Sequence, residues 1–202
     1  MTSTSPPRPA EVRQLETPAA LALSDLAGVF ENLQTVLHCC ERLMATLASP
    51  GSDGAPDQLA LEAYWTEAVL AYSRCFAAGE RGQQLTPDDL TGTGLPGDVL
   101  GWHRTLAQVQ TRYVDLSATP GETFSVGVAR DDTGAASGVA VTSRRAPVVD
   151  EVTVRQTGAV AFELARIVDE RIVALQERVF EGAAKLSPTE LDELPLLELV
   201  ED

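Results

Sequence analysis

The sequence has little positive charge, and almost none of it is lysine. Its 202 residues include 15 Lys or Arg against 30 Asp or Glu, so the formal net charge is -15, and Lys185 is the only lysine. A protein that binds a nucleic-acid backbone needs clustered cations that displace the counterions of the phosphates. The charge therefore disfavours nucleic acid as the partner.

Long apolar runs are also missing. No stretch approaches the roughly 18 apolar residues that a membrane-spanning helix needs, and the opening MTSTSPPRPAEVRQ has Pro and Arg where a signal peptide has its apolar core. The 3 cysteines include an adjacent pair and are too few and too irregular for an extracellular disulfide framework. We expect a cytoplasmic protein with no membrane segment.

Sequence motifs for common chemistries are absent. The stretch GTGLPGD lacks both the Lys-Ser/Thr ending and the preceding strand of a phosphate-binding loop, and no Ser stands in a Gly-x-Ser-x-Gly elbow. The soft metal ligands are spread over three expected helices and include no Cys-x2-Cys pair: His38, Cys39, Cys40, Cys75 and His103. We therefore expect no metal and no cofactor, and interpret the apolar-face cysteines as small buried side chains.

The first half of the chain predicts helices. Residues 1–16 are rich in Ser, Thr and Pro and are expected to be a flexible N-terminal segment. Thr17-Pro18 then has the pattern of a helix cap followed by proline at the first helical position. The helix that follows carries apolar side chains spaced alternately by four and three residues: Leu26, Phe30, Leu33, Leu37, Cys40, Met44 and Leu47.

Two further helices and a hairpin are expected before the last helix. One helix runs from about Gln58 to Ala78, and another from about Pro96 to Leu116, with a short helical turn near Asp88 between them. After Pro120-Gly121 the apolar pattern alternates, which predicts a β-hairpin at about 123–145. An isolated hairpin is marginally stable, so this one should lie on the helices or pair with another chain.

A long last helix completes a mainly α fold: a bundle of about four long helices, spanning 17–186, with an inserted β-hairpin. From about Glu151 the apolar residues step by four and three: Ala161, Ala165, Val168, Ile172, Leu175, Val179, Gly182 and Leu186. Leu164, Ile167 and Phe180 widen this stripe beyond one packing seam. The surplus predicts either a homodimer interface or a four-helix core that uses all of it.

Residues 187–202 form an acidic, leucine-containing tail. Ser187-Pro188 should end the last helix, and the tail beyond it, TELDELPLLELVED, alternates acids with leucines. It is too short to build a core of its own, so it either docks on its own domain or binds an unidentified protein partner. The candidate docking residues are Leu194, Leu196, Leu197 and Leu199.

Four stretches in the middle of the chain carry a family resemblance: YSRCFAAGERG (72–82), Trp102-His103, TRYVDLSATPGE (111–122) and the hairpin sequence FSVGV. They resemble a group of bacterial helical proteins related to the HEPN superfamily. In that group a Tyr-x-Arg-Cys-Phe segment on one helix precedes a histidine-bearing helix that ends in a motif of the kind Arg-x-Lys-His-x-Ala-His-Ser. The resemblance covers about Leu59 to Val141.

The resemblance also shows what this chain lacks. The first segment is matched by Tyr72, Arg74, Cys75 and Phe76, and the helix histidine is matched by His103. In the motif that ends the helix, Arg112 stands at the Lys, Tyr113 at the first His, Leu116 at the second His and Ser117 at the Ser. Glu122 stands at the acid that follows. Both histidines of the motif are thus replaced. HEPN ribonucleases pair an Arg that stabilises the phosphate with a His that transfers the proton of the 2′-hydroxyl. Without that His, the resemblance implies a non-catalytic relative.

Two interpretations of the candidate residues remain open. Arg74, His103, Arg112, Tyr113, Ser117 and Glu122 form the candidate binding set that the resemblance implies. An atypical ribonuclease, or an RNA- or nucleotide-binding site, would centre on Arg112, whereas the simpler interpretation gives Arg74, Arg112 and Glu122 internal ion pairs and helix-end hydrogen bonds.

A small-ligand pocket lined by aromatic rings is a further hypothesis. Its residues would be Tyr64, Trp65, Tyr72 and Trp102. Aromatic side chains at helical spacing mostly pack into a core, which is the simpler interpretation. Taken together, these patterns favour a homodimeric regulatory or protein-binding protein that acts through protein–protein contacts.

Overall fold

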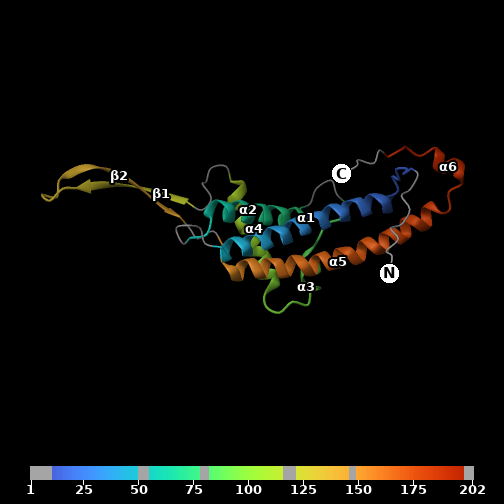
Figure 1. The fold of residues 1–202 in the computed structure, drawn as a ribbon, viewed down its shortest axis with the longest axis horizontal. Coiled ribbons are helices and arrows are strands. Elements are labelled where there is room, and N and C mark those ends of the chain that lie inside the picture. The colour runs from blue at the N-terminus through green and yellow to red at the C-terminus, as the bar shows by residue number, and fades with distance from the viewer. Residues whose placement is uncertain (1–10, 50–54, 78–81, 116–121, 146–148, 198–202) are drawn as a thin grey trace.

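A computed structural model describes residues 11–49, 55–77, 82–115, 122–145 and 149–197. The chain is mainly helical with one inserted antiparallel hairpin, as the sequence predicted (Figure 1). The elements, in order, are α1 (Pro18–Ala48), α2 (Gln58–Arg74), α3 (Pro87–Thr91), α4 (Val99–Val114), β1 (Glu122–Arg130), β2 (Ala136–Arg145), α5 (Glu151–Ala183) and α6 (Pro188–Asp192).

Local capping explains where the helices begin. The Thr17 side chain accepts a hydrogen bond from the backbone N–H of Ala20, with Pro18 at the first helical position, so α1 starts where the sequence predicted. Helix α4 begins at Val99, later than the predicted Pro96. Gly97 has a φ of 94°, which breaks the helical path, and the Asp98 side chain then caps the new helix.

The core forms where α1 packs against α2 on one side and α5 on the other. The α1 residues Leu33, Val36 and Leu43 are fully buried. Gly158 of α5 faces Cys40 of α1, and a Cβ at this position would lie 3.6 Å from the Cβ of Cys40, an ordinary van der Waals distance. Truncating one of the buried leucines to alanine would cost about 2–5 kcal/mol of stability.

The regular stripe of α5 belongs to this core. Ala161, Ala165 and Val168 are buried, and Ile172 and Leu175 pack against the core while partly exposed. The four-and-three spacing therefore describes packing against α1 within the chain. Of the three residues that widened the predicted stripe, Leu164 is buried in this core, Ile167 is partly buried, and Phe180 faces solvent.

The hairpin stands apart from the helices. Figure 1 shows it projecting from the end of the bundle at which α5 begins. The register pairs Val126 with Val141 and Val128 with Val139, with an irregularity between Ala129 and Arg130. Apart from Glu122, every strand side chain that the structure describes is exposed. The hairpin thus does not lie on its own helices, which was one of the two predicted arrangements.

The N-terminal segment and the tail pair at the opposite end of the molecule. Arg13 and Leu196 form an antiparallel bridge, with Gln14 N donating to Pro195 O at 2.8 Å and Leu197 N donating to Val12 O at 2.9 Å. The Arg13 guanidinium also donates to the carbonyl oxygens of Asp192 and Leu194. Of the four tail leucines, Leu199 falls outside the described residues.

None of the helices that the structure describes combines the length and apolar character needed to cross a membrane. The longest, α1 and α5, each bury one face and expose charged residues on the other.

Candidate functional site

The structure brings together two sequence segments that the family resemblance singled out. Tyr72 and Phe76, at the end of α2, meet His103 on α4, although 31 positions separate Tyr72 from His103. The Tyr72 hydroxyl and His103 Nδ1 share a hydrogen bond of 3.1 Å. The His103 ring also stacks at a tilt on Phe76, with 4.5 Å between the ring centroids.

Burial keeps both polar groups of this cluster neutral near pH 7. It lowers the pKa of His103 below its usual range, and the neighbouring positive charge of Arg104 lowers it further. Burial also raises the pKa of the Tyr72 hydroxyl far above its usual range. A neutral tyrosine–histidine hydrogen bond next to an aromatic ring ties α4 to α2, which is a structural role.

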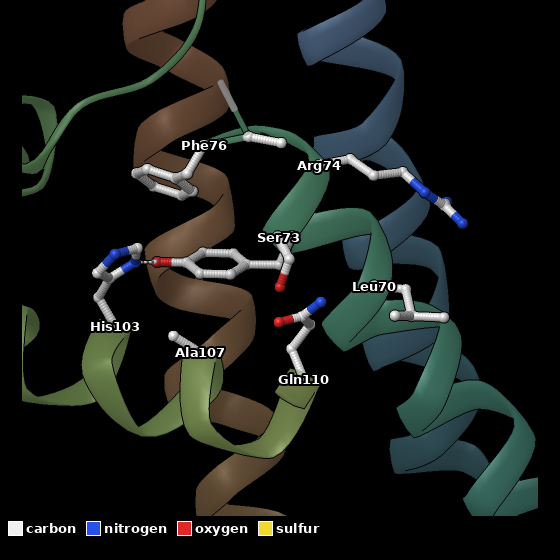
Figure 2. A pocket seen from close by; sticks show the side chains of 9 residues that line it. Leu70, Ser73, Arg74, Phe76, His103, Ala107 and Gln110 are labelled. Atoms are coloured by element: carbon white, nitrogen blue, oxygen red, sulfur yellow. Dashed lines mark hydrogen bonds between the residues drawn. The ribbon is translucent and has the colours of Figure 1, made fainter. Parts of the chain in front are cut away.

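A pocket of about 480 Å³ opens beside this cluster. Its wall comes from α2 and α4: Leu70, Tyr72, Ser73, Arg74, Phe76, Ala77, His103, Ala107 and Gln110. Figure 2 shows the Arg74 side chain pointing away from His103 and Phe76, and its guanidinium donates to Glu67 at 2.9 Å. The cluster thus presents neutral groups, and the one cation in the wall forms an exposed ion pair within α2, not a link between the helices and the hairpin.

The remaining candidate residues lie away from His103. Tyr113 is half-buried against α2, where burial raises its pKa and a hydrogen bond with Thr66 partly opposes the rise. Arg112 is exposed and has no ion pair or hydrogen bond with the described part of the chain. Glu122 is half-buried at the start of β1, and Ser117 falls outside the described residues.

Helix geometry separates Arg112 from His103. Arg112 follows His103 by nine residues on α4, which is about 2.5 turns and about 13.5 Å along the axis. The two side chains therefore leave opposite faces of the helix, one toward the Tyr72 cluster and one toward solvent. One phosphate group cannot contact both within a single chain, whereas catalysis of RNA cleavage requires both groups within hydrogen-bond reach.

The four aromatic rings of the small-ligand hypothesis do not line one pocket. Trp65 is buried in the core, and Tyr64 is partly buried against it. Only Tyr72 borders the pocket beside His103, while Trp102 lines a separate, shallow depression with Asp98. These rings are mostly core residues.

The sequence did not predict the ion pair between Arg171 and Asp89. Arg171 on α5 donates to Asp89 on α3, and Asp89 also accepts hydrogen bonds from the backbone N–H and hydroxyl of Thr86. Asp89 is only 7% exposed. Burial alone would raise the pKa of Asp89, but the hydrogen bonds from Arg171 and Thr86 outweigh it, so the pKa lies below its usual range. No sequence signal connected two residues on such distant elements.

The cysteines are structural. Cys39, Cys40 and Cys75 are buried and free, and burial raises the pKa of Cys40 to about 12. Within the described ranges, no group of three or more His, Cys, Asp or Glu side chains is close enough together to hold a metal ion.

The largest unexplained feature is exposed apolar surface. Beyond Val152 in its first turn, α5 has three large apolar side chains that face solvent: Phe162, Val173 and Phe180, at 60%, 48% and 74% exposure. They are eleven and seven residues apart, close to whole numbers of turns, so they follow one line along the helix. Only Phe180 was identified from the sequence, because Phe162 and Val173 each lie one residue after a position of the four-and-three stripe, Ala161 and Ile172.

The hairpin has a second apolar surface. Phe124, Val126 and Val128 of β1 share one face with Val139 and Val141 of β2, because they sit at alternate positions in register. All five are exposed.

Comparisons of the chain with protein-family models, with curated proteins and with solved structures find no match.

Proposed function

We propose that this chain is a non-catalytic, cytoplasmic protein that acts through protein–protein contacts and works as a homodimer formed along α5. The observation that carries the proposal is the line of Phe162, Val173 and Phe180 on the solvent side of α5, which we call the outer stripe. The core does not use it, and apolar surface of this kind marks a site of association. A C2 dimer would bring apolar residues of the stripe from both copies into one interface.

The chemistry of the candidate residues supports a role without catalysis. His103 is bound to Tyr72 and held neutral, Arg74 is paired with Glu67, and Arg112 lies on the opposite side of α4 from His103. An acid–base pair able to cleave RNA needs both groups at one reacting atom. The net charge of -15 also opposes binding of a polyanion.

A second protein partner would bind through the tail. Leu196 and Leu197 are exposed although their backbone pairs with the N-terminal segment. Their side chains remain free to enter an apolar groove on another protein, and the acids around them favour a basic rim on that groove.

Light scattering on the purified full-length chain tests the dimer. The chain mass is 21.5 kDa, so the proposal expects twice that mass at micromolar concentration. Phe162→Ser should shift the mass toward the monomer. Leu59→Ser is the control, because Leu59 is an exposed large apolar residue on α2.

Two results would contradict the proposal. A wild-type chain that stays monomeric at all accessible concentrations would remove the dimer. Cleavage of RNA by the purified chain, lost in Arg112→Ala, would replace the non-catalytic role with a ribonuclease. Recovery of a defined protein from the native lysate, lost when residues 188–202 are deleted, would support the role of the tail.

A further inference from the structure

We propose that the hairpin is an arm that packs on α5 of a second copy, so that in a twofold dimer each arm covers Phe162, the residue of the partner's outer stripe nearest the start of α5. The inference rests on the proposed dimer and specifies how it is built. It joins two apolar surfaces that each lack a cover: the hairpin face of Phe124, Val126, Val128, Val139 and Val141, and the outer stripe.

The two faces of the hairpin differ in a way that indicates a packing surface. Between Phe124 and Val128 one face carries the five large apolar residues and Ser143, with the pair Glu122 and Arg145 at its base, whereas the opposite face carries small or polar residues such as Gly127, Ala129 and Ala140. An uncovered two-stranded hairpin is marginally stable in water. A folded arm of this length therefore needs a surface against its apolar face, and its own helices do not supply one.

The position of the arm makes the second copy a geometrically suitable cover. The hairpin projects from the end of the bundle where α5 begins, and α5 runs in the opposite direction (Figure 1). A twofold axis near the start of α5, where Val152 is exposed, would carry each arm onto the α5 of the partner. Phe162 lies about 16 Å from the start of α5, and Val126 lies about 14 Å from the start of β1, so these two side chains would meet.

The area favours arm exchange over stacking of two hairpins. Nine-residue β1 is about 27 Å long and a two-stranded face is about 10 Å wide, which gives about 270 Å² per face. Two exchanged arms bury two hairpin faces and two matching helix surfaces, about 1,100 Å² in all, close to the lower limit for a specific interface. Two stacked hairpins would bury only about half of that, in the range of crystal-packing contacts.

The charge distribution favours the same contact. The whole chain has a net charge of -15, so two copies repel each other over most of their surface. The hairpin is the exception, because its three acids are balanced by three arginines: Glu122, Asp131 and Asp132 against Arg130, Arg144 and Arg145. A second copy meets less repulsion at the arm than elsewhere.

Matched pairs of variants test the contact through the dimer dissociation constant. Val141→Ser on the apolar face should raise Kd by about a hundredfold, since each dimer holds the contact twice at roughly tenfold each. Ala140→Ser, the neighbouring residue on the opposite face, should leave Kd unchanged. On α5, Phe162→Ser should weaken the dimer, whereas Phe180→Ser, about 27 Å farther along the helix and beyond the arm, should not.

A cross-linking experiment tests the geometry even if a variant destabilises the hairpin. Copies carrying Val126→Cys are mixed with differently tagged copies carrying Phe162→Cys under mild oxidation. The native cysteines are buried, so a disulfide-linked pair of the two tagged chains reports the predicted contact. Copies carrying Phe180→Cys serve as the control and should not cross-link to Val126→Cys.

Each outcome decides between the two proposals. A monomeric wild-type chain overturns both the dimer and the arm. A dimer that resists Val141→Ser but is weakened by Phe162→Ser keeps the dimer along α5 and overturns the arm. Efficient cross-linking of Val126→Cys copies to one another, without linkage to Phe162→Cys, would mean that hairpins stack on hairpins, and also overturns the arm exchange.

Discussion

Breaking the partly buried ion pair between α3 and α5 should destabilise the fold measurably. Arg171→Met removes the cation from Asp89, which is 7% exposed, and leaves it with hydrogen bonds only from Thr86. A hydrogen bond to a charged group contributes about 1.5–3 kcal/mol. The Arg171 side chain is 41% exposed, so water can partly replace it, and the expected loss lies near 2 kcal/mol.

Thermal unfolding at one fixed protein concentration measures this loss, because association would make Tm depend on concentration. A loss of about 2 kcal/mol corresponds to about 4–8 °C in Tm for a chain of this size. A double-mutant cycle with Asp89→Asn isolates the pair. Arg166→Met is the control: Arg166 lies on the same helix and contacts two carboxylates, Glu163 and Glu170, but in an exposed position, and no measurable change is expected.

The pH dependence of the stability checks whether Arg171 stabilises the charged form of Asp89. The folded-state pKa of Asp89 lies below its usual value, which is about 3.9 in an unfolded chain. The stabilisation by Arg171 is therefore complete above that pH and is lost as the pH falls through the folded-state pKa. A coupling energy near zero at pH 7, or a wild-type advantage that grows as the pH falls below 4, would refute the assignment.

Three further predictions address the remaining sites. In an NMR titration, His103 should titrate below the usual histidine pKa of about 6.5, because burial and then Arg104 disfavour its charged form. The His103→Gln variant identifies its signal. The contribution of His103 to stability is complete above that pH and declines as the pH falls, and a titration midpoint above about 6.5 would contradict this prediction. Cys40, whose pKa burial raises to about 12, should react with a thiol reagent at pH 8 only after unfolding, so rapid labelling of the native protein would argue against a structural role. Deletion of residues 188–202 should leave helical content and Tm unchanged, since no residue of α6 is buried; a large drop in Tm would make the tail part of the fold.

Most helix boundaries were predictable because capping is local. The pattern Thr17-Pro18 defined the start of α1, whereas Ser187-Pro188, which was expected to end the last helix, begins the short helix α6, which was not predicted. Pro87 and the acids after it gave the short helix near Asp88. The start of α4 was placed too early because the conformation of Gly97 is set by the path of the whole connection.

The candidate site was predictable only in part. Tyr72, Phe76 and His103, which the resemblance singled out, do meet, but neither spacing nor composition could indicate that Tyr72 binds His103. The nine-residue spacing between His103 and Arg112 is enough to place the two on opposite faces of a helix. His103 and Arg112 lie on opposite faces of α4. This difference affects the site only because α4 packs against α2 with the face that carries His103.

The sequence by itself determined the kinds of element in this protein: apolar spacing of three and four gives the long helices, and alternation after Gly121 gives the hairpin. Only the tertiary structure decided which apolar and charged side chains are buried. It placed Asp89 against Arg171, 82 positions away, and left Phe162, Val126 and Val141 facing solvent. The physical reason is that burial depends on which distant segments meet, whereas helix and strand formation depends mainly on neighbours along the chain.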